Sequence, residues 1–254
     1  MAPWQADQSA PPVPDVSLVL PTYNERDNLE PMLRALGDVL ARQTPEGRVL
    51  VIDDASPDGT GELADLLAAE LSFVEVLHRP GREGLGPAYL AGFHRVLAAG
   101  AELVAQIDCD LSHDPEDIPR LVAATAEADL AIGSRYVKGG GTRNWGAVRR
   151  VVSRAGCFYA RVVLGVPVRD LTGGIKCFRR ETLEGIDLDR VSPKGYAFQV
   201  ETTYRAIRRG FRVAEIPIVF SERRAGGSKM STGIVLEALW RVPLLRLQAL
   251  LGRL

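Results

Sequence analysis

The sequence has only three cysteines in 254 residues, and no two of them have the spacing of a zinc site or a disulfide framework. We therefore expect Cys109, Cys157 and Cys177 to be reduced thiols, as in cytosolic proteins. Basic residues are not in excess either, because 31 Lys and Arg stand against 32 Asp and Glu, for a net charge of -1. This balance argues against a nucleic-acid-binding protein.

Long apolar runs are also missing. No run reaches the roughly eighteen uninterrupted apolar residues of a transmembrane helix, so none is expected. Residues 1–15 contain four prolines but neither the basic nor the apolar region of a signal peptide, and we expect a disordered tail there. No G-x-G-x-x-G segment follows the first apolar run, which excludes a dinucleotide-dependent oxidoreductase. Together these absences predict a protein that stays in the cytoplasm.

Short apolar runs do alternate with helical patterns, at lengths typical of strands and helices. Strands are expected at 16–21, 48–53, 73–78, 103–108 and 130–134, with helices at 25–41, 59–71, 86–99 and 115–127 between them. Farther on, we expect helices at 145–164, 197–209 and 232–251, a strand or hairpin at 170–178 and a strand at 212–220. Such alternation predicts an α/β fold: a mostly parallel twisted sheet, Rossmann-like, with helices on both faces.

Polar side chains follow four of the expected strands, in the segments PTYNE (21–25), DDASPDG (53–59), DCD (108–110) and GSRY (133–136). Parallel sheets bind ligands at the carboxyl ends of their strands. Asp108 and Asp110 should leave their strand on the same side, where two carboxylates repel each other unless a cation lies between them. One or two carboxylates plus substrate phosphates suit Mg²⁺. The alternative to a metal site is that the two aspartates belong to a solvent-exposed strand end. The convergence of the four polar segments disfavours this alternative.

These motifs, with DCDLSHDPED (108–117) and ERRAGGSK (222–229), resemble the dolichol- or polyprenol-phosphate mannose synthases. Those are inverting enzymes of glycosyltransferase family 2 with the GT-A fold. The resemblance covers about residues 16–230, and it implies a GT-A catalytic domain over that range. It also implies transfer of mannose from GDP-mannose to a polyprenyl phosphate at the cytoplasmic face of a membrane, by a peripheral protein.

The resemblance further implies a donor site. Residues that match the family's guanosine-binding positions are Pro21, Tyr23, Glu25, Ile52 and Asp54. Asp108 and Asp110 would bind Mg²⁺ or Mn²⁺ across the diphosphate, and Cys109 between them would be a small apolar filler whose backbone touches the nucleotide. Arg223 and Lys229 would close over the diphosphate. Many relatives have a further metal ligand, glutamine, where this chain has Ser112.

For the acceptor phosphate, the resemblance implies Arg135, Arg149 and Ser153, with Arg135 grouped with the two aspartates as catalytic. Arg149 and Ser153 are four residues apart and share a helix face, and the planar guanidinium suits a phosphate. Arg150 and Arg154 are assigned to solvent or to lipid headgroups. Gln199 and Glu201 are candidates for sugar binding.

No histidine among His78, His94 and His113 has a convincing general-base position. A phosphate acceptor needs no such base, because its second pKa near 6 leaves it a dianion at neutral pH. Two other functions stay open: a UDP-glucose:polyprenyl-phosphate glucosyltransferase and a non-catalytic sugar-nucleotide-binding scaffold subunit.

The chain closes with an amphipathic helix at residues 231–254, which we expect to lie on the membrane surface or on a membrane-embedded partner protein. Packing against the catalytic core is the alternative.

Overall fold

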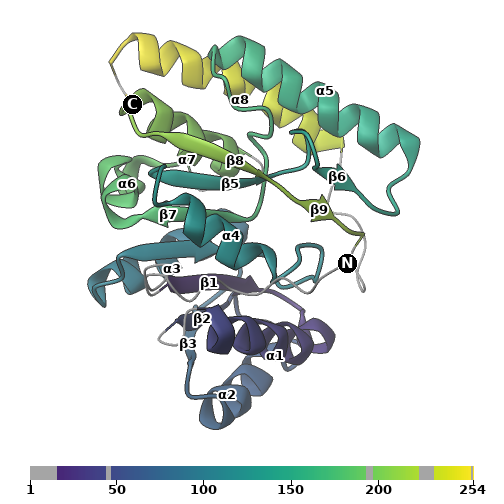
Figure 1. Ribbon diagram of the computed structural model, residues 1–254, viewed down its shortest axis with the longest axis vertical. Helices are drawn as coiled ribbons and strands as arrows, with labels where there is room; N and C mark the ends of the chain where they lie inside the picture. Colours follow the sequence, from purple (N-terminus) through teal and green to yellow (C-terminus); the bar gives the residue numbers. More distant parts are fainter. Residues whose placement is uncertain (1–15, 44–46, 193–196, 223–231, 253) are drawn as a thin grey trace, which may run out of the picture.

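The protein, described by a computed structural model over residues 16–43, 47–192, 197–222, 232–252 and 254, is built on a seven-stranded sheet (Figure 1). The strands of this sheet are β1 (Val16–Thr22), β2 (Arg48–Asp53), β3 (Val74–His78), β4 (Leu103–Gln106), β5 (Leu130–Ser134), β7 (Lys176–Arg179) and β8 (Val213–Pro217). Their order is β3-β2-β1-β4-β7-β5-β8. A separate ribbon pairs β6 (Gly141–Thr142) with β9 (Val219–Phe220). The tail expected at 1–15 lies outside the described residues.

The helices are α1 (Arg26–Gln43), α2 (Thr60–Glu70), α3 (Leu85–Ala98), α4 (Asp117–Ala124), α5 (Ala147–Leu164), α6 (Arg180–Gly185), α7 (Ala197–Arg208) and α8 (Thr232–Leu250), with a 3-10 turn at Leu188–Arg190. The expected α/β fold is confirmed, with bounds within a few residues for the elements up to β5. The sequence did not predict β6, α6 or the 3-10 turn.

One strand runs against the others. β7 pairs antiparallel with both β4 and β5, whereas every other pairing in this sheet is parallel. β7 is fully buried apart from Arg179 at its end, because strands of the sheet flank it and helices cover it. The sheet is therefore mostly parallel, as expected, with one reversed strand near its centre.

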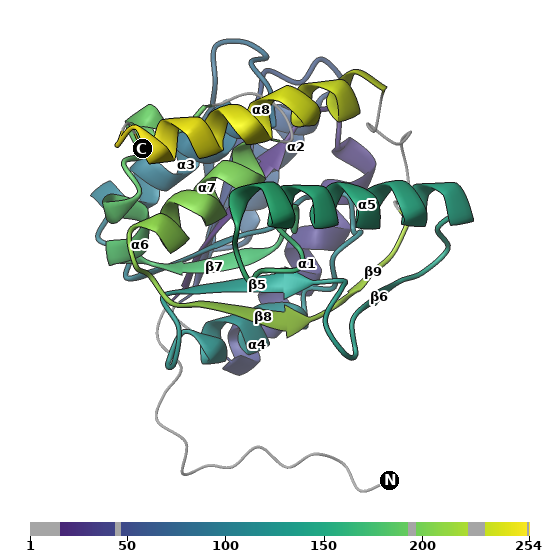
Figure 2. The same cartoon turned by 90° about the horizontal axis from the view of Figure 1, so that it is seen from above.

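Helices cover both faces of the sheet, and each face has its own apolar core (Figures 1 and 2). On one face, Leu18 and Leu20 of β1 pack with residues of α1, α2 and α4. On the other face, Val19 of the same strand packs with residues of α3, α5, α7 and α8. This alternation along β1 is the period-two pattern of a strand covered on both sides.

The C-terminal helix contributes to the second core. Val242, Leu245 and Ala249 of α8 are buried, at 3%, 4% and 7% exposure. Arg246 donates a hydrogen bond of 2.9 Å from Nη1 to the carbonyl oxygen of Leu164, at the end of α5. The inner face of the expected interfacial helix is thus part of the core, as in the alternative stated above. In the described ranges, no helix is long and apolar enough to cross a membrane.

Lys176 is the most unusual side chain in the sheet, because it is a lysine with 0% exposure in a central strand. Its Nζ donates to the carbonyl oxygen of Gln199 at 2.8 Å and to the hydroxyl of Thr202 at 3.3 Å. Burial lowers the pKa of Lys176 to about 7, although the charge of Asp170 partly opposes the shift. The folded protein therefore releases this proton at a lower pH than the unfolded chain does.

We predict that stability rises with pH between about 7 and the unfolded pKa near 10.5 because of Lys176. In that window the unfolded chain binds a proton that the folded chain lacks, which adds up to about 1.4 kcal/mol per pH unit to the free energy of unfolding. Lys176→Met should remove this slope. Urea unfolding at several pH values checks it, with exposed Lys138→Met as control. If the free energy of unfolding depends on pH in the same way for wild type and Lys176→Met, the burial argument is wrong.

Candidate active site

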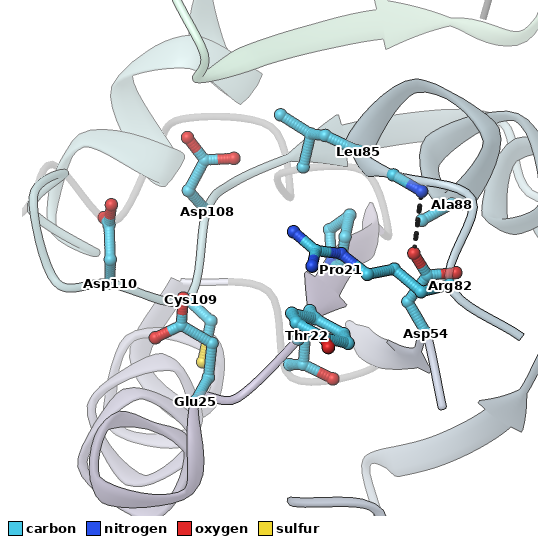
Figure 3. A pocket seen from close by; sticks show the side chains of 12 residues that line it. Pro21, Thr22, Glu25, Asp54, Arg82, Leu85, Ala88, Asp108, Cys109 and Asp110 are labelled. Atoms are coloured by element: carbon cyan, nitrogen blue, oxygen red, sulfur yellow. Dashed lines mark hydrogen bonds between the residues drawn. The ribbon is translucent and has the colours of Figure 1, made fainter. Parts of the chain in front are cut away.

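A cavity opens at the carboxyl ends of β1, β2 and β4, against the start of α3 (Figure 3). It is lined by Pro21, Thr22, Tyr23, Glu25, Asp54, Arg82, Gly84, Leu85, Ala88, Asp108, Cys109 and Asp110. All the described residues that the sequence assigned to the donor site lie in this wall, apart from Ile52. The side chain of Ile52 has 0% exposure and packs in the core against α3, where a Cβ on Gly92 would come within 3.0 Å of it.

Asp108 and Asp110 lie in a loop, because β4 already ends at Gln106. The prediction that the two side chains leave an extended strand was therefore wrong. The loop nevertheless directs both carboxylates to one side, with the thiol of Cys109 on the other, as Figure 3 shows. A positive φ of 57° at Leu111 turns the chain directly after the pair. The carboxylates reach the cavity through a tight turn instead of an extended strand.

Hydrogen bonds orient both carboxylates. The hydroxyl of Tyr89, a residue of α3 with 0% exposure, donates to Asp108 Oδ1 at 2.8 Å. Ser112 donates to Asp110 Oδ1 from its backbone nitrogen at 3.1 Å and from its hydroxyl at 2.5 Å. Ser112, at the position where the resemblance implies a glutamine in many relatives, thus positions Asp110.

Negative charge is concentrated at this end of the cavity. Burial raises the pKa of the Cys109 thiol well above its ordinary value, and the nearby carboxylates of Glu25, Asp110 and Asp108 raise it further. In the part of the chain that the structure describes, no three His, Cys, Asp or Glu side chains form a complete metal site. The two aspartates fit a hard divalent cation that takes its remaining ligands from phosphate oxygens and water.

The opposite wall of the cavity is held together by Asp54, which is 3% exposed. Its Oδ2 accepts hydrogen bonds from the backbone nitrogens of Glu83 at 3.1 Å and Gly84 at 2.8 Å, and its Oδ1 is paired with Arg79. Asp54 therefore fixes the loop between β3 and α3 against β2, and it keeps that loop at the rim of the cavity.

Arg82 in this loop was not expected from the sequence. Its guanidinium carbon lies 4.1 Å from the centre of the Tyr23 ring, so that a cation and an aromatic face stand together in the cavity wall. The signal was present in the sequence: residues 79–84 follow β3 and so lie at the same sheet edge as the other strand ends. The polar segments predicted for the site came only from the ends of four other strands.

Arg135, at the end of β5, forms a buried ion pair. Its guanidinium donates from Nε and Nη2 to the two carboxylate oxygens of Asp170, both at 2.7 Å, and from Nη2 to the hydroxyl of Thr172 at 2.6 Å. The side chain of Arg135 is 8% exposed and that of Asp170 is 0% exposed. Burial would raise the pKa of Asp170, but Arg135 and its hydrogen bonds hold it below the ordinary range. Arg135 is thus committed largely to a carboxylate of the protein.

Arg149 and Ser153 of α5 lie beside this pair, although neither lines the donor cavity. The guanidinium of Arg149 lies 4.1 Å from the Trp145 ring centre and 3.4 Å from Glu222 Oε1. Ser153 accepts a hydrogen bond of 2.6 Å from the Tyr136 hydroxyl. The backbone nitrogen of Ser221, the neighbour of Glu222, donates to the Ser112 carbonyl at 2.9 Å, which links Arg149 to the loop that carries Asp108 and Asp110.

The two sugar candidates do not face the cavity. Gln199 is 6% exposed, and its Oε1 accepts a hydrogen bond of 2.9 Å from Gln106. Glu201 is 4% exposed and pairs with Arg205 at 2.8 Å, beside a different hollow between α7 and α8. The Oε1 atom of Gln199 and the carboxylate of Glu201 are thus engaged within the protein, and neither residue lines the donor cavity. Arg223 and Lys229 lie outside the described residues.

Comparison with known proteins identifies a family and relatives that this chain resembles. The sequence profile of the family described as Glycosyl transferase family 2 matches residues 17–186. An undecaprenyl-phosphate mannosyltransferase of Micrococcus luteus is 49% identical over 227 residues, which is 89% of this chain and 92% of that protein. A polyprenol monophosphomannose synthase of Mycolicibacterium smegmatis is 50% identical over 227 residues, or 89% of this chain and 84% of that protein.

Solved structures share the fold at low sequence identity. The glucosyl-3-phosphoglycerate synthase of Mycobacterium tuberculosis in complex with Mn²⁺, UDP and phosphoglyceric acid has a TM-score of 0.61 and 21% identity. That likeness covers 94% of this chain and 78% of the other. A mannosyltransferase of Pyrobaculum calidifontis in complex with GDP-Man and Mn²⁺ has a TM-score of 0.59 and 18% identity, over 99% of this chain and 78% of the other.

Proposed function

Because this chain belongs to glycosyltransferase family 2, we propose that it transfers mannose from GDP-mannose to a polyprenyl monophosphate, with inversion at the anomeric carbon. The observation that carries the proposal is the pair Asp108 and Asp110, directed together into a cavity at the carboxyl ends of parallel strands. Two relatives near half identity, each named for a mannose transfer involving a polyprenyl or undecaprenyl lipid, support the substrates.

In this proposal, the donor nucleotide occupies the cavity of Figure 3. Tyr23 and Arg82 offer an aromatic face and a cation to the base and the phosphates, and Glu25 accepts hydrogen bonds from the nucleoside. Asp54 holds the loop that carries Arg82, and it can accept a further hydrogen bond only beside its contacts with Arg79, Glu83 and Gly84. Asp108 and Asp110 would hold Mg²⁺ or Mn²⁺. The ion supplies Lewis-acid stabilisation of the charge that develops on the GDP leaving group.

The acceptor phosphate approaches from the side of Arg149. This arginine can exchange its contact with Glu222 for a phosphate, since it is 22% exposed and the present separation is 3.4 Å. We assign Arg135 a supporting role, because Asp170 occupies most of its donors, and Ser153 a role in orienting Tyr136. The phosphate attacks as a dianion, so positioning and charge stabilisation suffice without a general base.

The two alternatives are less well supported. A non-catalytic scaffold would have no need of two acidic side chains that are oriented by hydrogen bonds from Tyr89 and Ser112. A UDP-glucose donor would fit the same fold, but both of the relatives described above are named for mannose transfer. Association with the surface of a membrane follows from a polyprenyl acceptor, and the cytoplasmic side of that membrane stays a prediction. A membrane-embedded partner protein stays a prediction.

We predict that Arg149→Ala will raise the KM for polyprenyl phosphate by roughly tenfold or more, because a charge-assisted hydrogen bond to phosphate contributes about 1.5–3 kcal/mol. The affinity for GDP-mannose should hardly change. Steady-state kinetics with each substrate varied in turn, together with calorimetric titration of GDP, measures the two effects. Arg143→Ala, which removes an exposed arginine four residues before Ala147, is the matched control. Equal weakening of GDP binding by Arg149→Ala would place this arginine in the donor site.

A further inference from the structure

The cavity of Figure 3 has two chemically different ends. Asp108 and Asp110 lie at one end, where the proposed metal ion would hold the diphosphate of the donor. Leu85 and Arg82 lie toward the other end, on the side of Asp54. Leu85 is 43% exposed in the cavity wall, and covering such an apolar side chain with a flat base is favourable. A nucleoside diphosphate held at the metal end therefore extends its base toward Leu85 and Arg82.

Arg82 is the only basic side chain among the described residues that line this cavity. Arg79 in the same loop is already committed, because it pairs with both Asp54 and Glu83. Within the described ranges, Arg82 has no ion pair with a carboxylate, and its contact is with the ring of Tyr23, 4.1 Å from the guanidinium carbon. A guanidinium carries five N–H donors and no acceptor. Arg82 can therefore offer several donors to a ligand in the cavity.

The position of Arg82 is set before a ligand binds. The two residues that follow it, Glu83 and Gly84, donate from their backbone nitrogens to Asp54 Oδ2 at 3.1 and 2.8 Å. These bonds fix the loop against β2, and the Tyr23 ring attracts the guanidinium from the side of β1. A donor that is already in place loses less conformational freedom when it forms a hydrogen bond. The cavity thus presents a preorganised arginine where the base would lie.

We infer that Arg82 selects guanine, by donating two hydrogen bonds to O6 and N7 of the base. These acceptors lie next to each other on one edge of guanine, and the planar arginine fork matches such a pair. Adenine has an amino donor beside N7, and uracil has a C–H group beside O4, so neither base can accept both bonds. The inference rests on the proposed function in one respect, since the donor nucleotide must occupy this cavity.

Calorimetric titration of the full chain with nucleoside diphosphates, in the presence of Mn²⁺, tests the inference. In 7-deaza-GDP, a C–H group replaces the N7 acceptor and the rest of GDP is unchanged. Wild type should bind GDP about tenfold more tightly than 7-deaza-GDP, because a hydrogen bond to a charged group is lost. Arg82→Ala should bind the two nucleotides equally, as in a double-mutant cycle, and its affinity for UDP should change less than about twofold.

Arg95→Ala is the matched control. It removes an arginine that is exposed, as Arg82 is, from the helix that follows the same loop, but outside the cavity. This variant should keep the wild-type preference for GDP over 7-deaza-GDP. Because Arg82 itself is exposed, Arg82→Ala should leave the fold intact, and an unchanged Tm verifies this.

Three results would overturn the inference. In the first, wild type binds GDP and 7-deaza-GDP equally. In the second, Arg82→Ala keeps the preference for GDP, so that another group contacts N7. In the third, Arg82→Ala weakens the binding of GDP, 7-deaza-GDP and UDP by the same factor, which would assign Arg82 to the diphosphate. Mannose transfer from GDP-mannose by wild type would leave the proposed function standing in all three cases. Tighter binding of UDP than of GDP by wild type would overturn both.

Discussion

Asp110→Asn should lower the rate of transfer at least about 100-fold, which corresponds to about 2.7 kcal/mol in the activation barrier. The change removes a negative charge from the pair that we propose as the metal site, but almost no volume. Asp110 is 3% exposed, and its Oδ1 accepts two hydrogen bonds from Ser112, which the asparagine amide oxygen can also accept. The fold should therefore survive the substitution.

Two further measurements support the Asp110→Asn test. Calorimetric titration of Mn²⁺ in the presence of GDP should show weaker metal binding by the variant, independently of activity. Asp114→Asn makes the same chemical change four residues later, outside the cavity, and should have little effect. If Asp110→Asn keeps more than about a tenth of wild-type activity, with Mn²⁺ affinity unchanged, the metal role is wrong.

Asp170→Asn should lower the free energy of unfolding by about 3–5 kcal/mol, because it leaves the buried Arg135 without its counter-charge. The carboxylate of Asp170 has 0% exposure and accepts from Arg135 at three nitrogen atoms, within 2.9 Å. For a domain of this size, such a loss lowers Tm by roughly 6–20 °C.

Thermal unfolding of Asp170→Asn, with Glu30→Gln as control, measures this effect. Glu30 pairs with Arg34 at 2.8 Å, but both side chains are about half exposed, and such a surface pair contributes at most about 1 kcal/mol. A similar small change in Tm for both variants would show that the Arg135–Asp170 pair does not stabilise the fold.

The fold was largely predictable because its signals are local. Apolar runs such as residues 49–52 are continuous, since β2 is covered on both faces, and each is followed by a helical pattern. The reversed strand β7 was not predictable in this way. Its sequence, Lys-Cys-Phe-Arg, begins with a lysine that only the long-range contacts with Gln199 and Thr202 of α7 make acceptable in a core.

The candidate site was predictable where its residues directly follow strands. Tyr23, Asp54 and the Asp108–Asp110 pair are such residues, and all line one cavity. The sequence could not reveal that Arg135 is engaged by Asp170, because 35 residues separate the partners. The i, i+4 spacing of Glu201 and Arg205 was visible in the sequence, but the burial of this pair outside the donor cavity was not, because it depends on how α7 packs.

The most direct test of the proposed function is product formation by the purified full chain. GDP-mannose or UDP-glucose is incubated with a short polyprenyl phosphate and Mg²⁺, and the lipid fraction is analysed by mass spectrometry. We expect a polyprenyl-phosphate hexose from GDP-mannose only, and none when EDTA is added. A product from UDP-glucose alone, or no product from either donor while GDP still binds, would contradict the proposed mannose transfer.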